Sequence, residues 1–580
     1  MGTQRPSKPR TEETDVFAED WWSHARPILE FHGYLRVRAE LFYRFSLGRL
    51  DPPQEMTWPR PADAPYTYNP PTFKQELCTE EEAGSGSNSS TDDLVRCSSN
   101  TQAGANMRFR LNPEIHVSDN LRIVSQIDIL DNLVLGSTSS AYSVTPAVSG
   151  GYAVAQRAGY GALGFSDGTT SPPRSAINSL SDSIHVKRAW GEYSTPVGEL
   201  RFGRMPNHWG LGMVYHSGDG YDDDYQSTMD RIQFVSGIKP LDLYLSASWD
   251  FPNEGPTSDN ISVQRTPAYD IGQLDDVDQY MFTVARRKSP EMQRLALARG
   301  DVVVNGGLQV TYRSQLLSAI DSTTDTDVPL GCDSEGGTTA LGCQPGDFEN
   351  SYTRRDAHYW LPDLWVQILY KKFRFELEAA TIQGSVGNAS TDPENTEGTG
   401  KYNFRQWGFA GEIEQLLAED RLRLGLGFGW ASGDQDVDGL TESPALNNNP
   451  FGQIGGDRDV ETFRFNPSYR VDLILFRNIL QRVQGAYYFR PNLGYDFVRE
   501  PAGQRLGGEV AAIWSRASEF IQAPGHDRDL GIEFNAALYF QSKDGALNDD
   551  PGEMGGFYSR LEYGILFPMA GLGYPAREAD

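Results

Sequence analysis

The chain has 580 residues, with 79 acidic and 51 basic side chains, and a formal charge of −28. This acid surplus argues against a nucleic-acid-binding protein, which needs a basic face. No apolar run approaches the roughly 18 residues of a membrane helix, which excludes a helical membrane protein. Strong β-forming residues recur along the whole chain, so a large β protein remains. Residues 1–15 contain no apolar stretch, so export is argued from the rest of the chain rather than from a signal peptide.

Several segments alternate apolar and polar residues with the period of a β-strand. In 421–430, Leu422, Leu424 and Trp430 share one face, while arginine and glycine occupy the other. In 107–117, Phe109 and Ile115 lie opposite a polar face that carries two arginines and a histidine. The polar faces are charged over about ten residues, and aromatic residues gather at strand ends, as in strands that cross a membrane.

The spacing of these segments predicts an antiparallel β-barrel. Eighteen candidate strands fall at 31–47, 105–117, 121–134, 183–195, 199–206, 229–237, 241–251, 277–288, 301–313, 355–370, 373–384, 403–416, 420–431, 468–478, 481–490, 506–518, 530–542 and 557–567. Their connections alternate between short and long, which is typical of an outer-membrane barrel with periplasmic turns and extracellular loops. We therefore expect a transmembrane barrel of 16–18 strands.

This topology divides the chain into three parts. Residues 1–30 are expected to be a periplasmic segment, 31–567 the barrel, and 568–580 a C-terminal tail. Two short-side connections, 289–300 and 519–529, are longer than the pattern requires, and the first is compatible with a short helix.

The four cysteines form two local pairs in predicted long loops. Cys78 and Cys97 lie in the first loop, and Cys332 and Cys343 lie in the fifth. Such pairs predict two loop disulfides in an oxidising compartment, and four free thiols are the alternative.

The acid surplus lies in long loops such as 216–225 and 432–439. Asp434, Asp436 and Asp438 are spaced like the start of a calcium loop, but Ala445 replaces the glutamate that an EF-hand needs. A solvated acidic loop is one interpretation. Weak calcium binding, with a bridge to lipopolysaccharide phosphates, is the other, and no further cofactor is expected.

Several predicted ascending strands begin with an inward arginine at the short-turn side. These residues are Arg122, Arg201, Arg374, Arg421 with Arg423, and Arg482. They are predicted to line the pore as a partial ring at the periplasmic mouth, opposite an acidic outer vestibule. Pairing with lumen acids, which include Glu376 and Glu378, is the alternative.

The sequence offers no catalytic constellation. It contains no nucleophile elbow, HExxH, P-loop or dinucleotide fingerprint, and His208 and His216 are interpreted as structural. We therefore predict that the protein is not an enzyme.

Three segments, 203–234, 463–479 and 561–568, resemble a family of uncharacterised outer-membrane β-barrel proteins of myxobacteria and related deltaproteobacteria. The start at 33–45 also fits, so the resemblance covers nearly the whole barrel. A further element, Gly203-Arg204 with Trp209-Gly210 and Gly212, resembles one shared by porins and polysaccharide-export barrels. The resemblance implies the fold and an outer-membrane location, and it implies no catalytic residues.

A barrel of this size encloses an aqueous lumen unless loops fill it. The leading hypothesis is a porin-like channel for small hydrophilic solutes, narrowed by inward-folded loops at 206–228 or 48–104. The alternatives are a polysaccharide-export barrel, or a plugged structural or adhesion barrel that anchors an envelope or motility complex. The expected partners are outer-membrane lipid, lipopolysaccharide, and a periplasmic or envelope-complex protein. The sequence does not define an oligomeric state.

Overall fold

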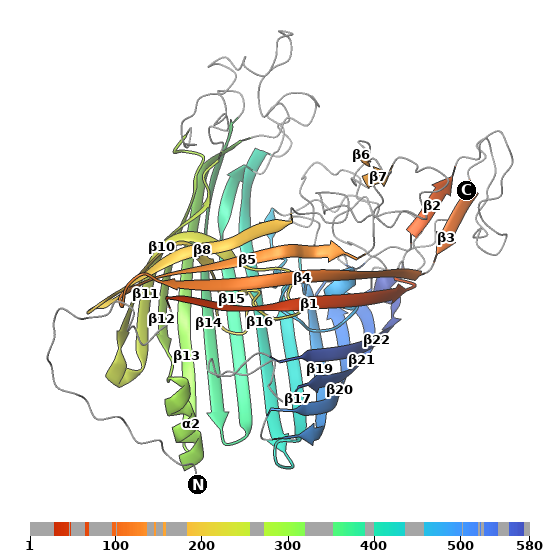
Figure 1. Ribbon diagram of the computed structural model, residues 1–580. Helices are drawn as coiled ribbons and strands as arrows, with labels where there is room; N and C mark the ends of the chain where they lie inside the picture. Colours follow the sequence, from red (N-terminus) through yellow and green to blue (C-terminus); the bar gives the residue numbers. More distant parts are fainter. Residues whose placement is uncertain are drawn as a thin grey trace.

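We describe the protein from a computed structural model. The structure describes residues 28–45, 47, 64–68, 95–99, 101–135, 144–146, 155–157, 183–255, 272–319, 352–388, 399–435, 458–500, 503–519, 523, 527–542 and 556–573. Strands dominate these residues and form a large, strongly curved sheet (Figure 1). None of the helices in the described part of the chain is long and apolar enough to cross a bilayer.

Eighteen strands belong to one sheet. They are β1 (Leu29–Tyr43), β4 (Thr101–His116), β5 (Leu121–Val134), β8 (Ile184–Thr195), β9 (Gly198–Pro206), β10 (Thr228–Ile238), β11 (Leu243–Asn253), β12 (Val277–Arg286), β13 (Val302–Ala319), β14 (Tyr352–Tyr370), β15 (Phe373–Asn388), β16 (Thr399–Leu417), β17 (Leu422–Ala431), β18 (Asp459–Val460), β19 (Ala486–Arg499), β20 (Arg505–Ala517), β21 (Asp529–Gln541) and β22 (Tyr558–Pro568). Two small hairpins, β2 (Ala64–Tyr68) with β3 (Val95–Ser99) and β6 (Val144–Pro146) with β7 (Ala155–Arg157), lie outside it.

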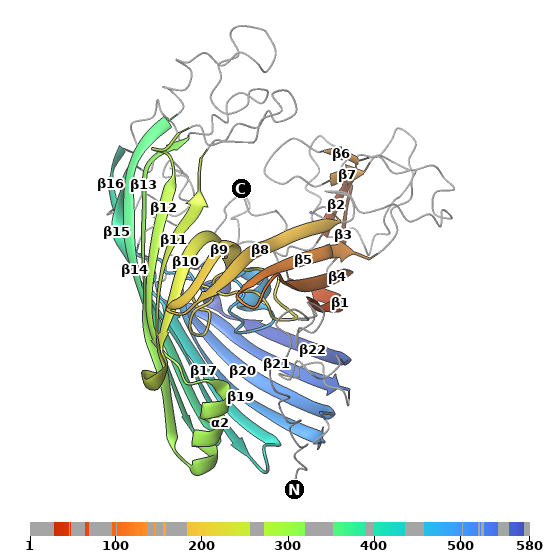
Figure 2. The same cartoon turned by 60° about the vertical axis from the view of Figure 1, so that its left-hand side comes forward.

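The strands pair antiparallel in chain order from β1 to β22, except that β17 pairs with β19. The two-residue β18 instead runs parallel to β16. Figure 2 shows how the meander curls round, so that its last strand, β22, approaches the hairpin of β1 and β4 at its beginning. The result is the antiparallel β-barrel that the alternation and spacing predict.

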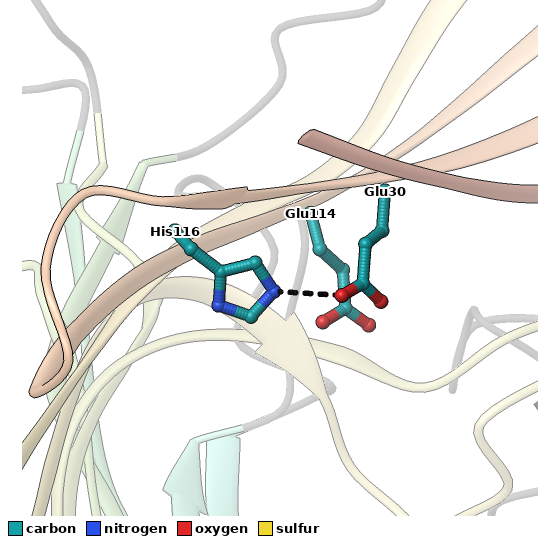
Figure 3. A group of neighbouring side chains, drawn as sticks. All are labelled: Glu30, Glu114 and His116. Atoms are coloured by element: carbon teal, nitrogen blue, oxygen red, sulfur yellow. Dashed lines mark ion pairs between the residues drawn. The ribbon is translucent and has the colours of Figure 1, made fainter. Parts of the chain in front are cut away.

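The two faces of the wall have opposite chemistry. The outward face exposes large apolar side chains, such as Leu41, which is 71% exposed. The inward face is polar, and Arg108 there is 1% exposed. The register between β1 and β4 places Glu30 opposite Glu114 on this inward face (Figure 3). An apolar exterior around a polar interior is the arrangement of a barrel that is surrounded by lipid.

Connections at one end of the barrel, the short-turn end, are mostly tight. The turn 117–120 joins β4 to β5, and Lys371 and Lys372 join β14 to β15. The longer connection after β12 contains helix α2 (Pro290–Arg299). The Ser289 side chain accepts the Met292 N–H at its start, and Gly300 ends it in the left-handed conformation, so the expected short helix is confirmed.

The predicted strand at 468–478 is wrong. Residues 461–485, which we call the second inward segment, cross the lumen without joining the sheet, and Leu475–Ile479 form a short π-helix. The Leu473, Ile474 and Leu475 N–H groups donate to the carboxylate of Glu533 on β21, at 2.9–3.0 Å. These bonds satisfy backbone groups that a strand would have paired with its neighbours.

The loss of this strand reverses the direction of every strand after it. Trp430, near the long-loop end of β17, pairs with Tyr487, so β19 runs toward the short-turn end instead of away from it. The connection from β19 to β20 therefore lies at the short-turn end, where the Glu500 N–H donates to the Gln504 carbonyl at 2.9 Å, although the sequence predicted a long outer loop at this point of the chain. Likewise, 542–557 connects β21 to β22 at the short-turn end. Seventeen long wall strands remain once β18 is set aside from the eighteen.

The main apolar core lies inside the barrel. It is formed by the second inward segment, whose Phe463, Phe465, Leu475 and Phe476 are at most 2% exposed. Gly408 on β16 makes room for this segment, because a Cβ there would lie 2.4 Å from the ring of Phe463. A barrel wall that faces lipid cannot supply such a core by itself, so the apolar residues of 461–485 are buried in the lumen and not in the membrane.

Candidate functional site in the lumen

Arginines line one side of the lumen. Arg36 and Arg38 lie on β1, Arg108 and Arg110 on β4, and Arg188 on β8. Alternation places them on the inward face, because Phe109 between Arg108 and Arg110 points outward. Buried guanidinium groups need anionic or carbonyl partners, and the segment 207–227 supplies them.

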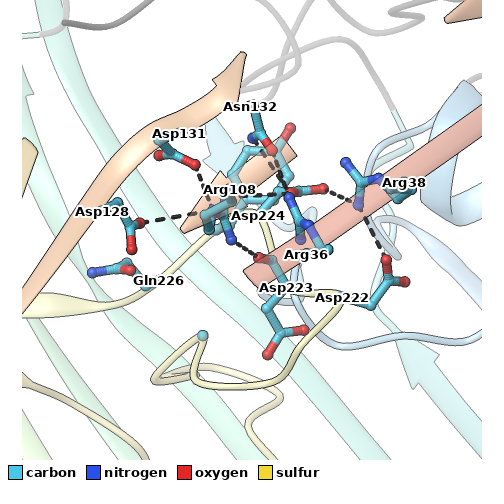
Figure 4. A network of polar contacts seen from close by, with 12 residues as sticks. Arg36, Arg38, Arg108, Asp128, Asp131, Asn132, Asp222, Asp223, Asp224 and Gln226 are labelled. Carbon is cyan, nitrogen blue, oxygen red and sulfur yellow. Dashed lines mark hydrogen bonds and ion pairs between the residues drawn. The ribbon is translucent and has the colours of Figure 1, made fainter. Parts of the chain in front are cut away.

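Residues 207–227, which we call the first inward segment, connect β9 to β10 and fold against these arginines (Figure 4). Asp224 accepts from Arg36 at 3.0 Å and from Arg38 at 2.9 Å, and Asp222 accepts from Arg38 at 3.1 Å. The predicted inward folding of 206–228 is therefore confirmed. The acidic stretch 216–225, however, lies within the lumen rather than in an outer vestibule.

The backbone of the first inward segment also takes part. Arg108 donates to the Asp223 carbonyl at 2.6 Å, and Arg110 donates to the Gly218 carbonyl at 2.9 Å. The two arginines are held in place by Asp131 and Asp128 on β5. The guanidinium groups thus join the wall to both the side chains and the carbonyls of the segment.

The arginines around the first inward segment lower the pKa values of two of its aspartates, Asp222 and Asp224. Burial alone would raise the pKa of Asp224, but Arg38 and Arg36 outweigh burial and hold that pKa well below its usual range. The pKa of Asp222 is lowered in the same way, because Arg477, Arg470 and Arg38 outweigh its burial. The segment therefore stays anionic at neutral pH.

A wall carboxylate anchors the other part of the first inward segment. Glu378 on β15 accepts the N–H of Leu211 at 2.5 Å and those of Met213 and Val214 at 3.3 Å. The sequence predicted Glu378 to line the pore. In the structure it is fully buried, and its carboxyl group binds protein backbone. Glu533 does the same for the second inward segment, and the Asn466 N–H donates to the Met213 carbonyl at 2.7 Å, which links the two segments.

Two histidines of the first inward segment have structural contacts. The His208 Nδ1 accepts the Ser217 N–H at 3.3 Å, and the His216 Nδ1 accepts the Gly218 N–H at 3.0 Å. Burial, with a smaller contribution from His216, lowers the pKa of His208 to about 4. A neutral imidazole suits its role as a hydrogen-bond acceptor.

Four of the arginines predicted at the periplasmic mouth lie in ion pairs with glutamates. Arg122 pairs with Glu192 at 2.5 Å and Arg201 with Glu199 at 2.6 Å. The other two are Arg374, with Glu376 at 2.8 Å and Glu412 at 2.7 Å, and Arg423, with Glu509 at 3.8 Å. The pairing alternative therefore describes their contacts, and their role in conduction stays a prediction.

Two further arginines of that set lie elsewhere. Arg421 ends the turn that leads into β17, where its carbonyl accepts the Asp496 N–H at 2.9 Å. Arg482 does not open an ascending strand. It belongs to the second inward segment and precedes β19 at the end opposite the short turns, so it is not part of a periplasmic ring.

The remaining site predictions fall largely outside the described residues. Asp434 is described, and its carboxylate accepts the Glu461 N–H at 2.9 Å, but Asp436 and Asp438 lie outside. Cys78, Cys332 and Cys343 also lie outside, and Cys97 is described only as a backbone position of β3 opposite Tyr66. The calcium and disulfide hypotheses remain predictions.

No family model and no curated protein matches the chain. Among solved structures, OpdK of Pseudomonas aeruginosa with vanillate is 11% identical, with 80% of this chain and 89% of that chain covered and a TM-score of 0.36. OccK8 (OprE) of the same organism is 11% identical over 80% and 90% of the two chains, with a TM-score of 0.35. An anion-selective porin from Comamonas acidovorans is 9% identical over 72% and 82%, with a TM-score of 0.32.

The fold itself decides the location, because the barrel exposes an apolar outer face and buries a polar inner one. Strand-built barrels with this arrangement belong to outer membranes. The chain is an outer-membrane β-barrel protein.

Proposed function

We propose that the protein is a porin-like channel for small hydrophilic solutes whose lumen is narrowed by the two inward segments. The observation that carries this proposal is the partial exposure of charged side chains on the inward faces of wall strands, outside the second inward segment. Arg374, Glu412, Arg423, Arg490 and Arg560 have 29–36% of their side-chain surface exposed. Charges exposed to this extent require water, so this part of the lumen is solvated.

The inward segments supply the constriction. The first occupies the arginine side of the lumen, and the second packs its apolar core against the inner faces of β16, β21 and β22. A path between them would be lined by fixed charges of both signs, which suits small polar solutes better than apolar ones.

Single-channel conductance in a planar bilayer tests the proposal. Wild-type protein should give stable steps, and the variant Asp222→Asn/Asp224→Asn should give larger or noisier steps, because it weakens the contacts of the first inward segment with Arg36 and Arg38. Asp230→Asn is the matched control, since it removes the exposed ion pair between Asp230 and Arg204. Each sample should first show the heat-dependent gel shift of a folded barrel.

A plugged structural barrel is the second candidate, and the apolar core within the lumen favours it. Silent bilayers from protein that is folded and inserted would support this candidate and reject the channel. Silence in wild type with clear steps in Asp222→Asn/Asp224→Asn would indicate a closed channel that opens when the first inward segment is released.

A further inference from the structure

Two acidic and two histidine side chains gather on the lumen face at the short-turn end of β1 and β4. Glu30 and His32 alternate on β1, and Glu114 and His116 alternate on β4. The antiparallel register puts Glu30 directly opposite Glu114, and Figure 3 shows His116 and both glutamates turned toward one another. This group takes no part in the contacts that hold the inward segments.

The spacing of this group is that of metal ligands. One ligand atom each from Glu30, Glu114 and His116 lies within 4.8 Å of the other two. The His116 Nε2 lies 3.4 Å from Glu30 Oε1, is buried from solvent, and has no hydrogen-bond partner among the described residues. The His32 Nε2 lies 3.6 Å from the other oxygen of Glu30 and is not part of this group of three.

The electrostatics of the pair also call for a cation. Like charges directly opposite each other on neighbouring strands are destabilising. Arg122 lies 3.5 Å from Glu114, but it is shared with Glu192, to which it is closer at 2.5 Å. Glu30 has only the imidazoles of His32 and His116 as ion-pair partners among the described residues.

We propose that Glu30, Glu114 and His116 bind a divalent transition-metal ion of the zinc class through these three protein ligands. Imidazole nitrogen combined with carboxylate oxygen suits zinc and its neighbours, whereas calcium and magnesium prefer sites built from oxygen alone. Small side-chain rotations bring the donors to the roughly 2.0–2.2 Å that zinc requires. The ion would join the first strand of the barrel to β4 at the periplasmic mouth.

Titration calorimetry of the full-length, folded barrel in detergent tests this site, after the protein has been stripped of metal with a chelator. Zinc chloride is the probe, and calcium chloride is the comparison. We expect saturable binding of one zinc ion per chain, weakened at least tenfold in Glu114→Gln and in His116→Ala. His358→Ala, which removes an exposed histidine on β14, is the matched control and should bind like wild type.

Arg122→Gln gives a prediction of opposite sign. Because it removes a positive charge that competes for Glu114, zinc affinity should rise severalfold in this variant. Cobalt substitution provides a second readout, since absorption bands of cobalt bound by nitrogen and oxygen should appear in wild type and be lost in His116→Ala.

Three results would overturn the site: no saturable zinc binding, binding that is unchanged in both Glu114→Gln and His116→Ala, or calcium bound as tightly as zinc. Every variant must retain the heat-dependent gel shift, so that loss of binding is not loss of the barrel. Zinc held elsewhere on the chain would show the second of these results.

Discussion

The carboxylate of Glu378, on β15, accepts the backbone N–H of Leu211 at 2.5 Å across the lumen. The same carboxylate also accepts the N–H groups of Met213 and Val214, so one wall residue holds a whole turn of the first inward segment. Glu533 on β21 likewise accepts three consecutive backbone N–H groups of the second inward segment. Buried carboxylates thus satisfy backbone donors that lack a strand partner.

Replacing Glu378 by alanine should release the turn around Leu211. This change leaves three backbone N–H groups without their acceptor, at about 1–3 kcal/mol for each donor left unsatisfied, so the turn should lose several kcal/mol of local stability. Hydrogen exchange followed by mass spectrometry should show faster exchange at 211–214, while wall strands far from it keep their protection. Glu376→Ala serves as the control, because Glu376 accepts from Trp365 and Arg374 side chains and not from this backbone. Equal exchange in the two variants would contradict the anchor.

The contacts of Asp224 predict an unusual pH dependence. Its pKa is depressed in the folded protein, so its contribution is present above its unfolded value of about 3.9 and is lost only as pH falls through the lower folded pKa. Loss of this contact should therefore cause no change in channel conductance between neutral pH and about 4. The first inward segment should begin to detach from Arg36 and Arg38 only below about pH 4. A transition near pH 4 or higher that disappears in Asp224→Asn would show that Arg36 and Arg38 do not hold this carboxylate.

Arg423 should influence ion selectivity. Arg423, Arg490 and Arg560 all lie within 3.8 Å of Glu509 in the solvated part of the lumen. Arg423→Gln removes one positive charge there, so the ratio of cation to anion permeability should rise by roughly twofold or more. Reversal potentials in a salt gradient give this ratio. Arg405→Gln removes a largely exposed arginine that pairs with Asp459 and should leave selectivity unchanged; the same shift in both variants would be evidence against a local filter.

Phe463 should stabilise the second inward segment from within the lumen. Its ring is 1% exposed and packs against Gly408 and Phe465, so Phe463→Ala should cost about 3–5 kcal/mol of local stability. Limited proteolysis should then cut 461–485 faster. Phe534→Ala changes an outward aromatic residue on β21 and should leave this segment as resistant as wild type. No difference between the two variants would mean that the core does not hold the segment.

Much of the wall was predictable from alternation alone. Phe109 and Leu424 lie outward, and Arg108 and Arg423 lie inward, as the sequence indicates. The period of two fixes which residues share a face, and the excess of apolar side chains on one face fixes which of them meets lipid. The short helix after β12 was predictable as well, because Ser289 and Gly300 are local end signals.

The acidic stretch around Asp222 was found in the sequence, which assigned it both to an acidic outer vestibule and to an inward-folded loop, and the structure supports the second assignment. A signal for its true position exists in the alternation of Arg36 with Arg38 and of Arg108 with Arg110. These inward arginines need acceptors, and the run Asp222–Asp224 is rich in them. Unpaired charges on the inward face of a predicted wall therefore indicate which loop of opposite charge folds into the lumen.

The sequence by itself determined an outer-membrane barrel, because strand period, turn spacing and side-chain polarity are local properties that each segment carries. Only the tertiary structure decided where residues 468–478 go. An apolar segment is stabilised equally by lipid and by a core within the lumen, and local pattern does not distinguish these environments. The inward course of this segment reversed the direction of every later strand and moved Arg482 away from the short-turn end.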